Sequence, residues 1–333
     1  MNFLKITISV FAIVVIICIS LSMAGEKQSP ISGTFVSFAW HHQNWDQLRW
    51  AKEFEAMAKL KFDTLIIQSV ARLEPDSDKV ISYYSSKSYQ TKWPHVDWIL
   101  NEADRRDWKV YLGGVADDTG EYDNDPEFVE LSKKIADELY SSYKMHKSFA
   151  GYYIATEPLL NEAGKYGKRA IYKVYGKYLK EKYPEKKVVL SPYFITDASV
   201  RCKKSGLKKW WHDRNPKEMA KQATLFLKNC PVDIVALQDS TCWDVTMDDL
   251  RKYLPEISQN VQAAGREFWV DMEVFDTYGH TTYAPAPIQR IMEQIEVEKK
   301  YKCVMYTFNW CMDPNGTEHS KALYEQYYNA YFK

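Results

Sequence analysis

Eight short apolar segments recur along the chain, each rich in β-branched and aromatic residues, and this pattern predicts β-strands. They cover residues 33–40, 62–70, 108–115, 149–156, 187–194, 232–238, 267–275 and 303–310. Longer segments between them carry apolar residues three and four positions apart, which predicts amphipathic helices. These cover residues 45–60, 94–106, 126–145, 168–182, 216–228, 247–264, 287–300 and 320–331.

Residues suited to helix ends support these boundaries. Asn44 is a good N-cap for the first helix, and Pro94 suits the first turn of the second. Gly265 stands just past the end of the sixth helix, where a left-handed backbone commonly ends a helix.

Eight successive strand–helix units predict an α/β fold, a closed (β/α)₈ TIM barrel that forms a single domain over residues 31–333. A doubly wound open sheet is the alternative, but no glycine-rich phosphate-binding motif follows any predicted strand. The loops 71–93, 116–125 and 195–215 are long, and each follows a strand. Because such loops build the active sites of barrels, we expect the functional site at the carboxyl ends of the strands.

The N-terminus predicts export. Lys5 precedes an uncharged apolar run over residues 6–23, which ends in small residues at Ser22 and Ala24. This pattern is typical of a secretory signal peptide over residues 1–24, with an uncleaved membrane anchor as the alternative. Either alternative predicts a secreted or extracytoplasmic protein.

Composition narrows the class of partner. The chain has 44 Lys plus Arg against 44 Asp plus Glu, so its net charge is zero and gives no support to a nucleic-acid partner. Aromatic residues make up 15% of the chain. They fit a large core, and they fit equally a cleft in which sugar rings stack on aromatic side chains.

Five cysteines follow the N-terminal segment, so at least one is unpaired. Cys303 opens a predicted strand and is expected to be a buried thiol. Cys202, Cys242 and Cys311 fall in loops on one rim of the barrel, where a disulfide among them is an open alternative.

Two glutamates stand at the ends of predicted strands. Successive side chains of a strand point to opposite faces, so Tyr153 and Glu157 share the inward face of the fourth strand. In the seventh strand, Trp269, Asp271 and Glu273 share the inward face. We therefore expect Glu157 and Glu273 to meet across the mouth of the barrel.

Such a pair has the chemistry that glycoside hydrolysis requires. One carboxyl group donates a proton to the leaving oxygen, while the other attacks the anomeric carbon or activates water. The structural alternative is that one or both glutamates only close an ion pair at the rim.

The motif Thr156-Glu157-Pro158 resembles the clan A glycoside hydrolases, whose barrels carry an acid/base glutamate after strand 4 and a nucleophilic glutamate after strand 7. The resemblance implies that Glu157 is the acid/base, that Glu273 is the nucleophile and that the enzyme retains configuration. Thr156 stands where the clan has an asparagine that helps hold the sugar. The chain also resembles a family of barrel proteins named only as a domain of unknown function and suspected of acting on glycans, through segments 33–35, 151–158, 191–194, 237–239 and 271–273.

Further candidates for substrate binding lie at predicted strand ends. Gln68 ends the second strand, and Tyr193, Gln238 and Asp239 lie between the two glutamates around the barrel. Their polar groups suit sugar hydroxyls, although Asp239 could instead cap a loop.

Trp40 and Trp310 end the first and eighth strands, which become neighbours when the barrel closes. They predict a platform for stacking a sugar, or alternatively rim core. In clan A, a tryptophan after strand 8 often has the stacking role.

A metal site is not expected. His41 and His42 are adjacent and therefore point to opposite sides of an extended chain, and the other histidines form no second cluster. The sequence thus predicts a glycosidase that acts on an oligo- or polysaccharide without metal or cofactor. The rival hypotheses are a non-catalytic carbohydrate-binding barrel and a metal-dependent hydrolase, and the oligomeric state stays open.

Overall fold

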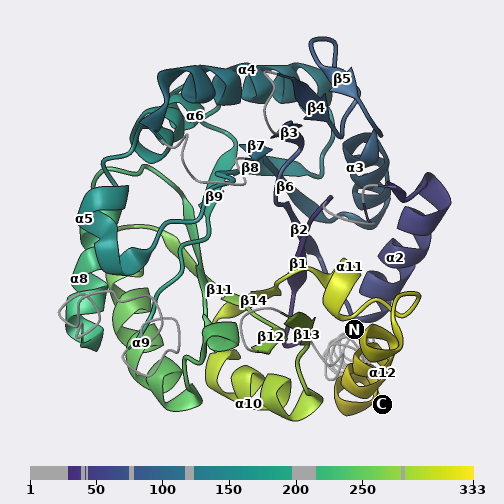
Figure 1. The fold of residues 1–333 in the computed structure, drawn as a ribbon, viewed down its shortest axis with the longest axis vertical. Coiled ribbons are helices and arrows are strands. Elements are labelled where there is room, and N and C mark those ends of the chain that lie inside the picture. Colours follow the sequence, from purple (N-terminus) through teal and green to yellow (C-terminus); the bar gives the residue numbers. More distant parts are fainter. Residues whose placement is uncertain are drawn as a thin grey trace, which may run out of the picture.

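The predicted strands close into a barrel in the computed structural model, which describes residues 29–38, 42, 44–74, 79–116, 124–196, 215–278 and 282–333. All neighbouring barrel strands are parallel (Figure 1). Around the barrel the order is β1 (Gly33–Val36), β2 (Thr64–Ile67), β6 (Lys109–Gly113), β8 (Phe149–Tyr153), β9 (Lys187–Leu190), β10 (Ile234–Gln238), β11 (Glu267–Met272) and β14 (Lys302–Met305), with β14 pairing β1. The TIM-barrel prediction is confirmed.

A ring of helices surrounds the barrel in Figure 1. Its main members are α2 (Gln47–Lys59), α3 (His95–Arg106), α4 (Pro126–Tyr143), α6 (Gly176–Lys182), α8 (Pro216–Leu227), α9 (Met247–Ala263), α10 (Ile288–Glu298) and α12 (Glu318–Phe332). Asp46 caps α2 by accepting from the backbone N–H of Arg49, so the predicted cap at Asn44 is wrong by two residues. Gly265 has a φ of 74°, as expected after α9.

The helical segment that follows the fourth barrel strand is divided into more elements than predicted. Residues expected as a single helix over 168–182 form the π-helical turn η4 (Ile171–Tyr175) followed by α6. The short helices η3 (Leu160–Glu162) and α5 (Ala163–Tyr166) precede them.

Alternation along the strands separates two apolar cores. Tyr153 and Trp269 lie in the small cluster that fills the barrel, together with Phe35, Ile66, Tyr111, Val189, Ile234, Ala236 and Val304. Tyr152, Phe268, Val270 and Met272 belong to the larger cluster beneath the helices. The predicted inward face of the fourth and seventh strands is therefore confirmed at Tyr153 and Trp269.

Glycine lets neighbouring strands approach closely at position 151. A Cβ atom on Gly151 would lie 1.9 Å from the backbone oxygen of Lys187 on β9. We expect Gly151→Ala to lower the free energy of unfolding by about 1–3 kcal/mol, because the strand must shift to relieve the overlap. Urea unfolding would measure this. Gly164→Ala is the matched control, since its Cβ would meet nothing within 4 Å; equal losses in both variants would contradict the prediction.

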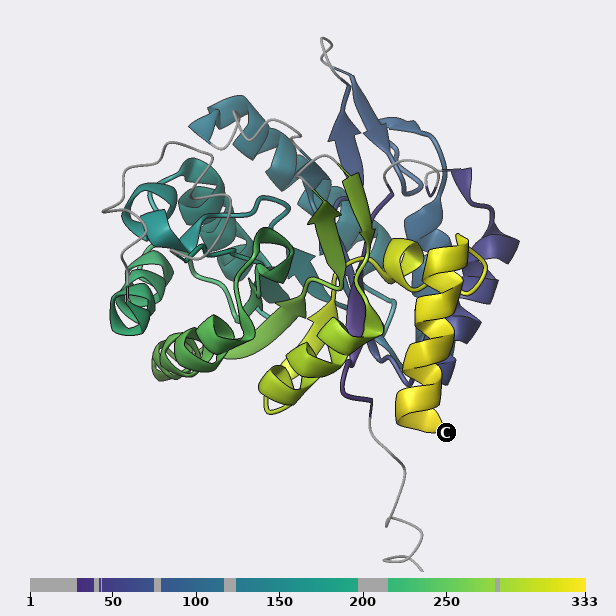
Figure 2. The same ribbon diagram turned by 60° about the horizontal axis from the view of Figure 1, so that its bottom comes forward.

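Additional strands rise from the loops at the carboxyl end of the barrel (Figure 2). One sheet is built by β3 (Ala71–Leu73), β4 (Val80–Ser82), β5 (Gln90–Thr91) and β7 (Val115–Ala116). It joins two of the long predicted loops. A hairpin of β12 (Phe275–Tyr278) and β13 (Thr282–Pro285) follows the seventh barrel strand. This hairpin was not predicted.

The eighth strand is shorter than its apolar segment. β14 ends at Met305, and Thr307 adopts a left-handed backbone with a φ of 43°. The chain then forms the helical turn α11 (Phe308–Cys311). Trp310 therefore lies on this turn, and the prediction that it ends a strand is wrong.

The first and last parts of the barrel are joined by a buried ion cluster. Arg49 on α2 donates to Glu53 over 2.8 Å and also bonds Asp313, which follows α11. Glu53 is fully buried, and Asp313 is 2% exposed. Burial, then the charge of Asp313, raises the pKa of Glu53 well above its usual range. One guanidinium thus holds two buried carboxyl groups together.

The cysteines described are thiols. Cys230, Cys242, Cys303 and Cys311 are free and buried, which confirms the expectation for Cys303. No disulfide joins Cys242 to Cys311, and Cys202 lies outside the described residues.

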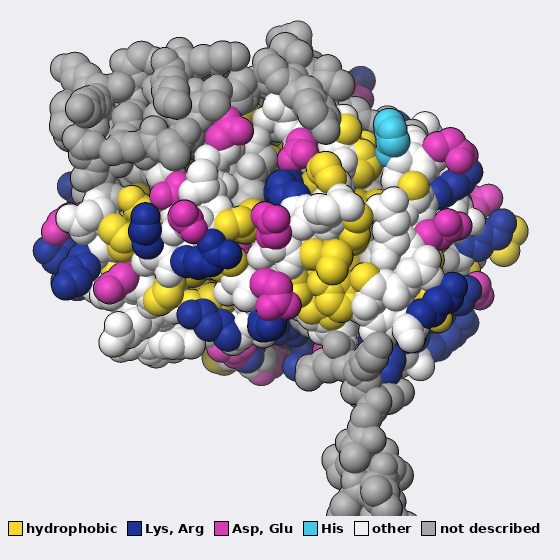
Figure 3. Space-filling view, turned by 90° about the horizontal axis from the view of Figure 1, so that it is seen from below, with side chains coloured by type: hydrophobic (Ala, Val, Ile, Leu, Met, Phe, Trp, Pro, Cys, Tyr) yellow, Lys and Arg dark blue, Asp and Glu magenta, His cyan; other side chains and the backbone are white. Residues whose placement is uncertain are grey.

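The surface carries no block of one charge on the face seen in Figure 3, where acidic and basic side chains are interspersed. No helix among the described residues is long and apolar enough to span a membrane. The predicted signal segment over residues 1–24 lies outside the part of the chain that the structure describes.

Candidate active site

Glu157 follows β8 at the carboxyl end of the barrel, and its side chain is exposed. The segment that carries it is fixed against the neighbouring strand. The backbone N–H of Tyr193 donates to the carbonyl of Pro158 over 3.1 Å, and the N–H of Leu160 donates to the carbonyl of Tyr193 over 2.8 Å. Tyr193, a predicted site residue, thus lies beside the glutamate segment and is half-buried.

Glu273 directly follows β11 and is only 3% exposed. Its Oε2 accepts a hydrogen bond of 2.9 Å from the backbone N–H of Cys242. Burial, then the negative charge of Asp239, raises the pKa of Glu273 to about 8, although the Cys242 donors and Arg290 oppose this shift. Burial therefore distinguishes the two glutamates.

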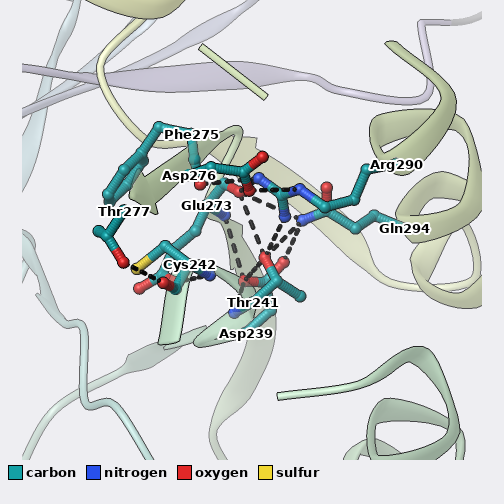
Figure 4. Close-up of polar contacts among 9 residues, drawn as sticks. All are labelled: Asp239, Thr241, Cys242, Glu273, Phe275, Asp276, Thr277, Arg290 and Gln294. Atoms are coloured by element: carbon teal, nitrogen blue, oxygen red, sulfur yellow. Dashed lines mark hydrogen bonds and ion pairs between the residues drawn. The ribbon is translucent and has the colours of Figure 1, made fainter. Parts of the chain in front are cut away.

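A polar cluster fixes the backbone of Glu273 (Figure 4). The backbone N–H of Glu273 donates to Asp239 Oδ1 over 3.3 Å, and its carbonyl accepts from Arg290 over 2.9 Å. Gln294 donates to Asp239 Oδ2 over 2.6 Å. Because Arg290 and Gln294 both belong to α10, the cluster attaches the end of β11 to the helix layer.

Asp239 belongs to this supporting cluster. It is fully buried, and its Oδ1 also accepts from the backbone N–H of Thr241 over 3.0 Å. Val235 and Leu237, which share its side of the β10 strand, pack under the helices. This placement favours the loop-cap alternative for Asp239 over contact with substrate.

Asp271 lies on β11, two residues before Glu273, and is 1% exposed. Burial, then the charges of Glu157 and Glu273, raises its pKa well above the usual range for aspartate. Ser191 Oγ lies 3.1 Å from Asp271 Oδ2 and 2.7 Å from the carbonyl oxygen of Ala236. Glu157 and Glu273 therefore both lie within electrostatic reach of one buried carboxyl group.

Two tyrosines lie near Glu157. Burial, then the charge of Glu157, raises the pKa of Tyr153 and of Tyr306. Tyr306 also hydrogen-bonds Gln68, which brings that predicted residue into the same group. Tyr153 and Tyr306 were not predicted as site residues, although the inward face of the fourth strand already contained Tyr153.

Gln238 lies beside Asp271 in the barrel wall. The two residues are register partners of β10 and β11. Gln238 Nε2 donates to the carbonyl of Ser191 over 3.2 Å, and the side chain is buried. Its amide group is therefore already used in a hydrogen bond within the protein.

Three aromatic side chains pack together where the β12–β13 hairpin meets α11. The Trp310 ring lies 5.8 Å from that of Phe275 and 6.4 Å from that of Tyr283 on the hairpin. Tyr283 is 50% exposed, whereas Trp310 is half-buried. Trp40, the predicted partner of Trp310, lies outside the described residues. The hairpin supplies an exposed ring that the sequence pattern did not indicate.

Metal-binding geometry is not found in the described ranges, where no group of three or more His, Cys, Asp or Glu side chains could hold an ion. His42 is buried, and its Nε2 lies 2.8 Å from the carbonyl oxygen of Asn309. His41 lies outside those ranges.

Comparisons with known proteins agree on the barrel. A family model described as "Domain of unknown function (DUF4434)" matches residues 31–318. A candidate α-L-fucosidase from Bacteroides thetaiotaomicron superposes with a TM-score of 0.74 and 22% identity, over 92% of this chain and 98% of that one. A GH18 chitinase from Pseudoalteromonas aurantia gives a TM-score of 0.52 at 14% identity, over 88% and 99%.

A xylanase from Paenibacillus barcinonensis gives a TM-score of 0.50 at 14% identity, over 86% of each chain. No match to a curated protein was found. At these identities the likeness concerns the fold.

Proposed function

We propose that this chain, which belongs to the DUF4434 family, is a glycoside hydrolase that cleaves O-glycosidic bonds of an extracellular or cell-wall glycan. One observation carries the proposal: Glu157 and Glu273 follow the fourth and seventh strands of a closed barrel, and the charges of both raise the pKa of the buried Asp271. A pair of carboxyl groups at such a mouth has the chemistry for glycosyl transfer to water.

In the proposed mechanism Glu157 is the acid/base and Glu273 is the nucleophile. Glu157 donates a proton to the glycosidic oxygen while Glu273 attacks the anomeric carbon and forms a glycosyl-enzyme. Glu157 then takes a proton from the water that hydrolyses this intermediate, so the sugar keeps its configuration. No metal or cofactor enters these steps.

Two contacts of Glu273 support its role as nucleophile, against the burial and the Asp239 charge that raise its pKa to about 8. The Cys242 N–H directed at Oε2 stabilises the ionised form, and Arg290 adds positive charge nearby. The bonds from Asp239 and Arg290 to the Glu273 backbone hold the carboxylate at the strand end. Such fixed geometry favours in-line attack on a bound sugar.

The pH profile is expected to report these roles. Because the pKa of Glu273 is raised to about 8, a nucleophile at this position ionises only as the pH rises through that value. We therefore expect kcat/KM to increase with pH up to about 8, since kcat/KM follows the free enzyme. A decrease through the same pH would instead make Glu273 the proton donor and reverse the two roles.

The substrate is proposed to be an oligo- or polysaccharide that stacks on the aromatic group formed by Phe275, Tyr283 and Trp310. An aromatic face suits the apolar face of a pyranose, while Gln68 and Tyr193 offer hydrogen bonds to hydroxyl groups. We also propose that residues 1–24 direct export, which would place the barrel where such glycans occur.

Sugar release tests the proposed function. The purified protein would be incubated with aryl α-L-fucosides, xylan, chitin oligosaccharides and a wider glycan panel, beside Glu157→Gln and Glu273→Gln. Release by the wild type that both variants lose would support the proposal and identify the substrate. Glycan binding without release, unchanged in both variants, would instead support a carbohydrate-binding barrel.

A further inference from the structure

We propose that Asp271 is a neutral carboxylic acid in the folded protein and acts as a positioning residue within electrostatic reach of Glu157 and Glu273. Its effect on turnover rests on the proposed function, whereas its protonation does not.

Ser191 has one hydroxyl proton but two close oxygen neighbours. The carbonyl oxygen of Ala236, at 2.7 Å, can only accept a hydrogen bond, so the shorter contact uses the serine proton. The contact of 3.1 Å between Ser191 Oγ and Asp271 Oδ2 then needs a proton from the aspartic acid. A chain of donors from Asp271 to Ser191 to Ala236 results, and it joins β11, the end of β9 and β10.

Among the residues that the structure describes, no basic side chain pairs with Asp271. Within the described part of the chain it forms no ion pair, and its Oδ1 is buried with no hydrogen-bond partner. An ionised carboxylate in that position would be strongly disfavoured. If Asp271 is neutral, the unpaired Oδ1 is a buried polar atom, which costs less free energy than a buried charge.

The charged groups whose electric field acts on Asp271 are acidic. Glu157 comes from the segment after β8, Glu273 from the end of β11 and Asp239 from the end of β10. Tyr153 on β8, Ser191 after β9 and Gln238 on β10 are neutral neighbours. On β14 the register partner of Asp271 is the apolar Val304, and Glu298 on α10 is a further acidic group in its electrostatic reach. Burial and these negative charges together hold the pKa of Asp271 high, which agrees with the proton required by Ser191.

Neutrality at Asp271 has a consequence for the glutamates. A third negative charge within electrostatic reach of them would raise the pKa of both and would hinder ionisation of the nucleophile. The neutral acid instead adds a fixed hydrogen bond beneath the site. Glu157 then remains the group that gives and takes the proton, and Glu273 remains free to ionise and attack the anomeric carbon.

Asp271→Asn distinguishes a neutral Asp271 from an ionised one. The asparagine amide keeps the size of the side chain and a donor for Ser191, but it carries no charge at any pH. Thermal unfolding of the wild type and of the variant would be followed from about pH 4 to pH 9. A carboxyl group with a raised pKa keeps its proton in the folded state while the unfolded chain loses it above about pH 4, so the wild type loses stability as pH rises. Asparagine has no such loss.

We therefore expect the melting temperature of Asp271→Asn, relative to the wild type, to rise with pH. A difference that stays constant or falls with pH would overturn the proposal. This measurement needs no substrate, so it remains decisive if sugar release is never found.

The pH profile of kcat/KM tests the positioning role. A neutral Asp271 predicts the same rising limb near pH 8 in Asp271→Asn as in the wild type, whereas loss of a negative charge would move that limb to lower pH. Asp271→Leu, which removes the donor to Ser191, should lower kcat while Asp271→Asn retains it. Equal activity of the leucine and asparagine variants would contradict the positioning role.

Discussion

Replacement of Glu273 by glutamine is expected to lower kcat/KM for the glycan substrate by about a thousand-fold or more, because an amide cannot attack the anomeric carbon. The fold should survive. Glutamine has nearly the volume of glutamate, and its side-chain oxygen can still accept from the Cys242 N–H that now binds Oε2. Initial rates of sugar release, with circular dichroism as a check on folding, measure the effect.

Glu296→Gln is the matched control, since Glu296 lies on α10 and is 66% exposed. Its activity should equal that of the wild type. Azide added to Glu273→Ala distinguishes the proposed nucleophile from the proposed acid/base, because the anion fits the space left by the shorter side chain, attacks from that side and yields a glycosyl azide of inverted configuration. A folded Glu273→Gln enzyme within tenfold of wild-type activity would refute the two-glutamate mechanism.

Arg49→Ala is expected to cause the largest loss of stability, about 3–5 kcal/mol in the free energy of unfolding, because it leaves buried carboxyl groups without their cation. Arg49 bonds both Glu53 and Asp313, which are almost completely buried. The pKa of Glu53 is already raised in the wild type. The variant should therefore lose less at acidic pH, where Glu53 can be protonated, than at pH 8.

Arg251→Ala provides the comparison for Arg49→Ala. The pair of Arg251 and Asp248 is 57% and 78% exposed, so its removal should change stability by less than about 0.5 kcal/mol. Urea unfolding at pH 5 and pH 8 would compare the two variants. Similar small losses at both positions would show that the buried cluster adds little to the closure of the barrel.

The barrel could be predicted because its strands carry a local signal. Alternation placed Tyr153 and Trp269 inside and Tyr152 and Phe268 outside, and the structure confirms all of them. The end of the eighth strand carried no such signal. The apolar residues of α11 resemble a strand continuation, and only the left-handed backbone at Thr307 turns the chain into a helix.

The contacts of the residues at the carboxyl end of the barrel could not be predicted from the sequence pattern. Asp239 differs from Gln238 by one position, and that single step turns its carboxylate toward α10 and away from the barrel axis. Tyr283 reaches the rim only because the β12–β13 hairpin folds back beside Phe275. The pattern could identify most strand ends, but the contacts of Asp239 and Tyr283 arise between segments far apart in the chain.

The reactivity of the buried thiols can report how often the structure around each of them opens. Cys230, Cys242, Cys303 and Cys311 are each less than 5% exposed, so a thiol reagent can reach them only when the surrounding structure parts. Cys242 sits against Glu273, whereas Cys303 lies in β14. The rate of labelling at Cys242 would therefore follow local opening of the mouth, and labelling at Cys303 would follow separation of the barrel strands.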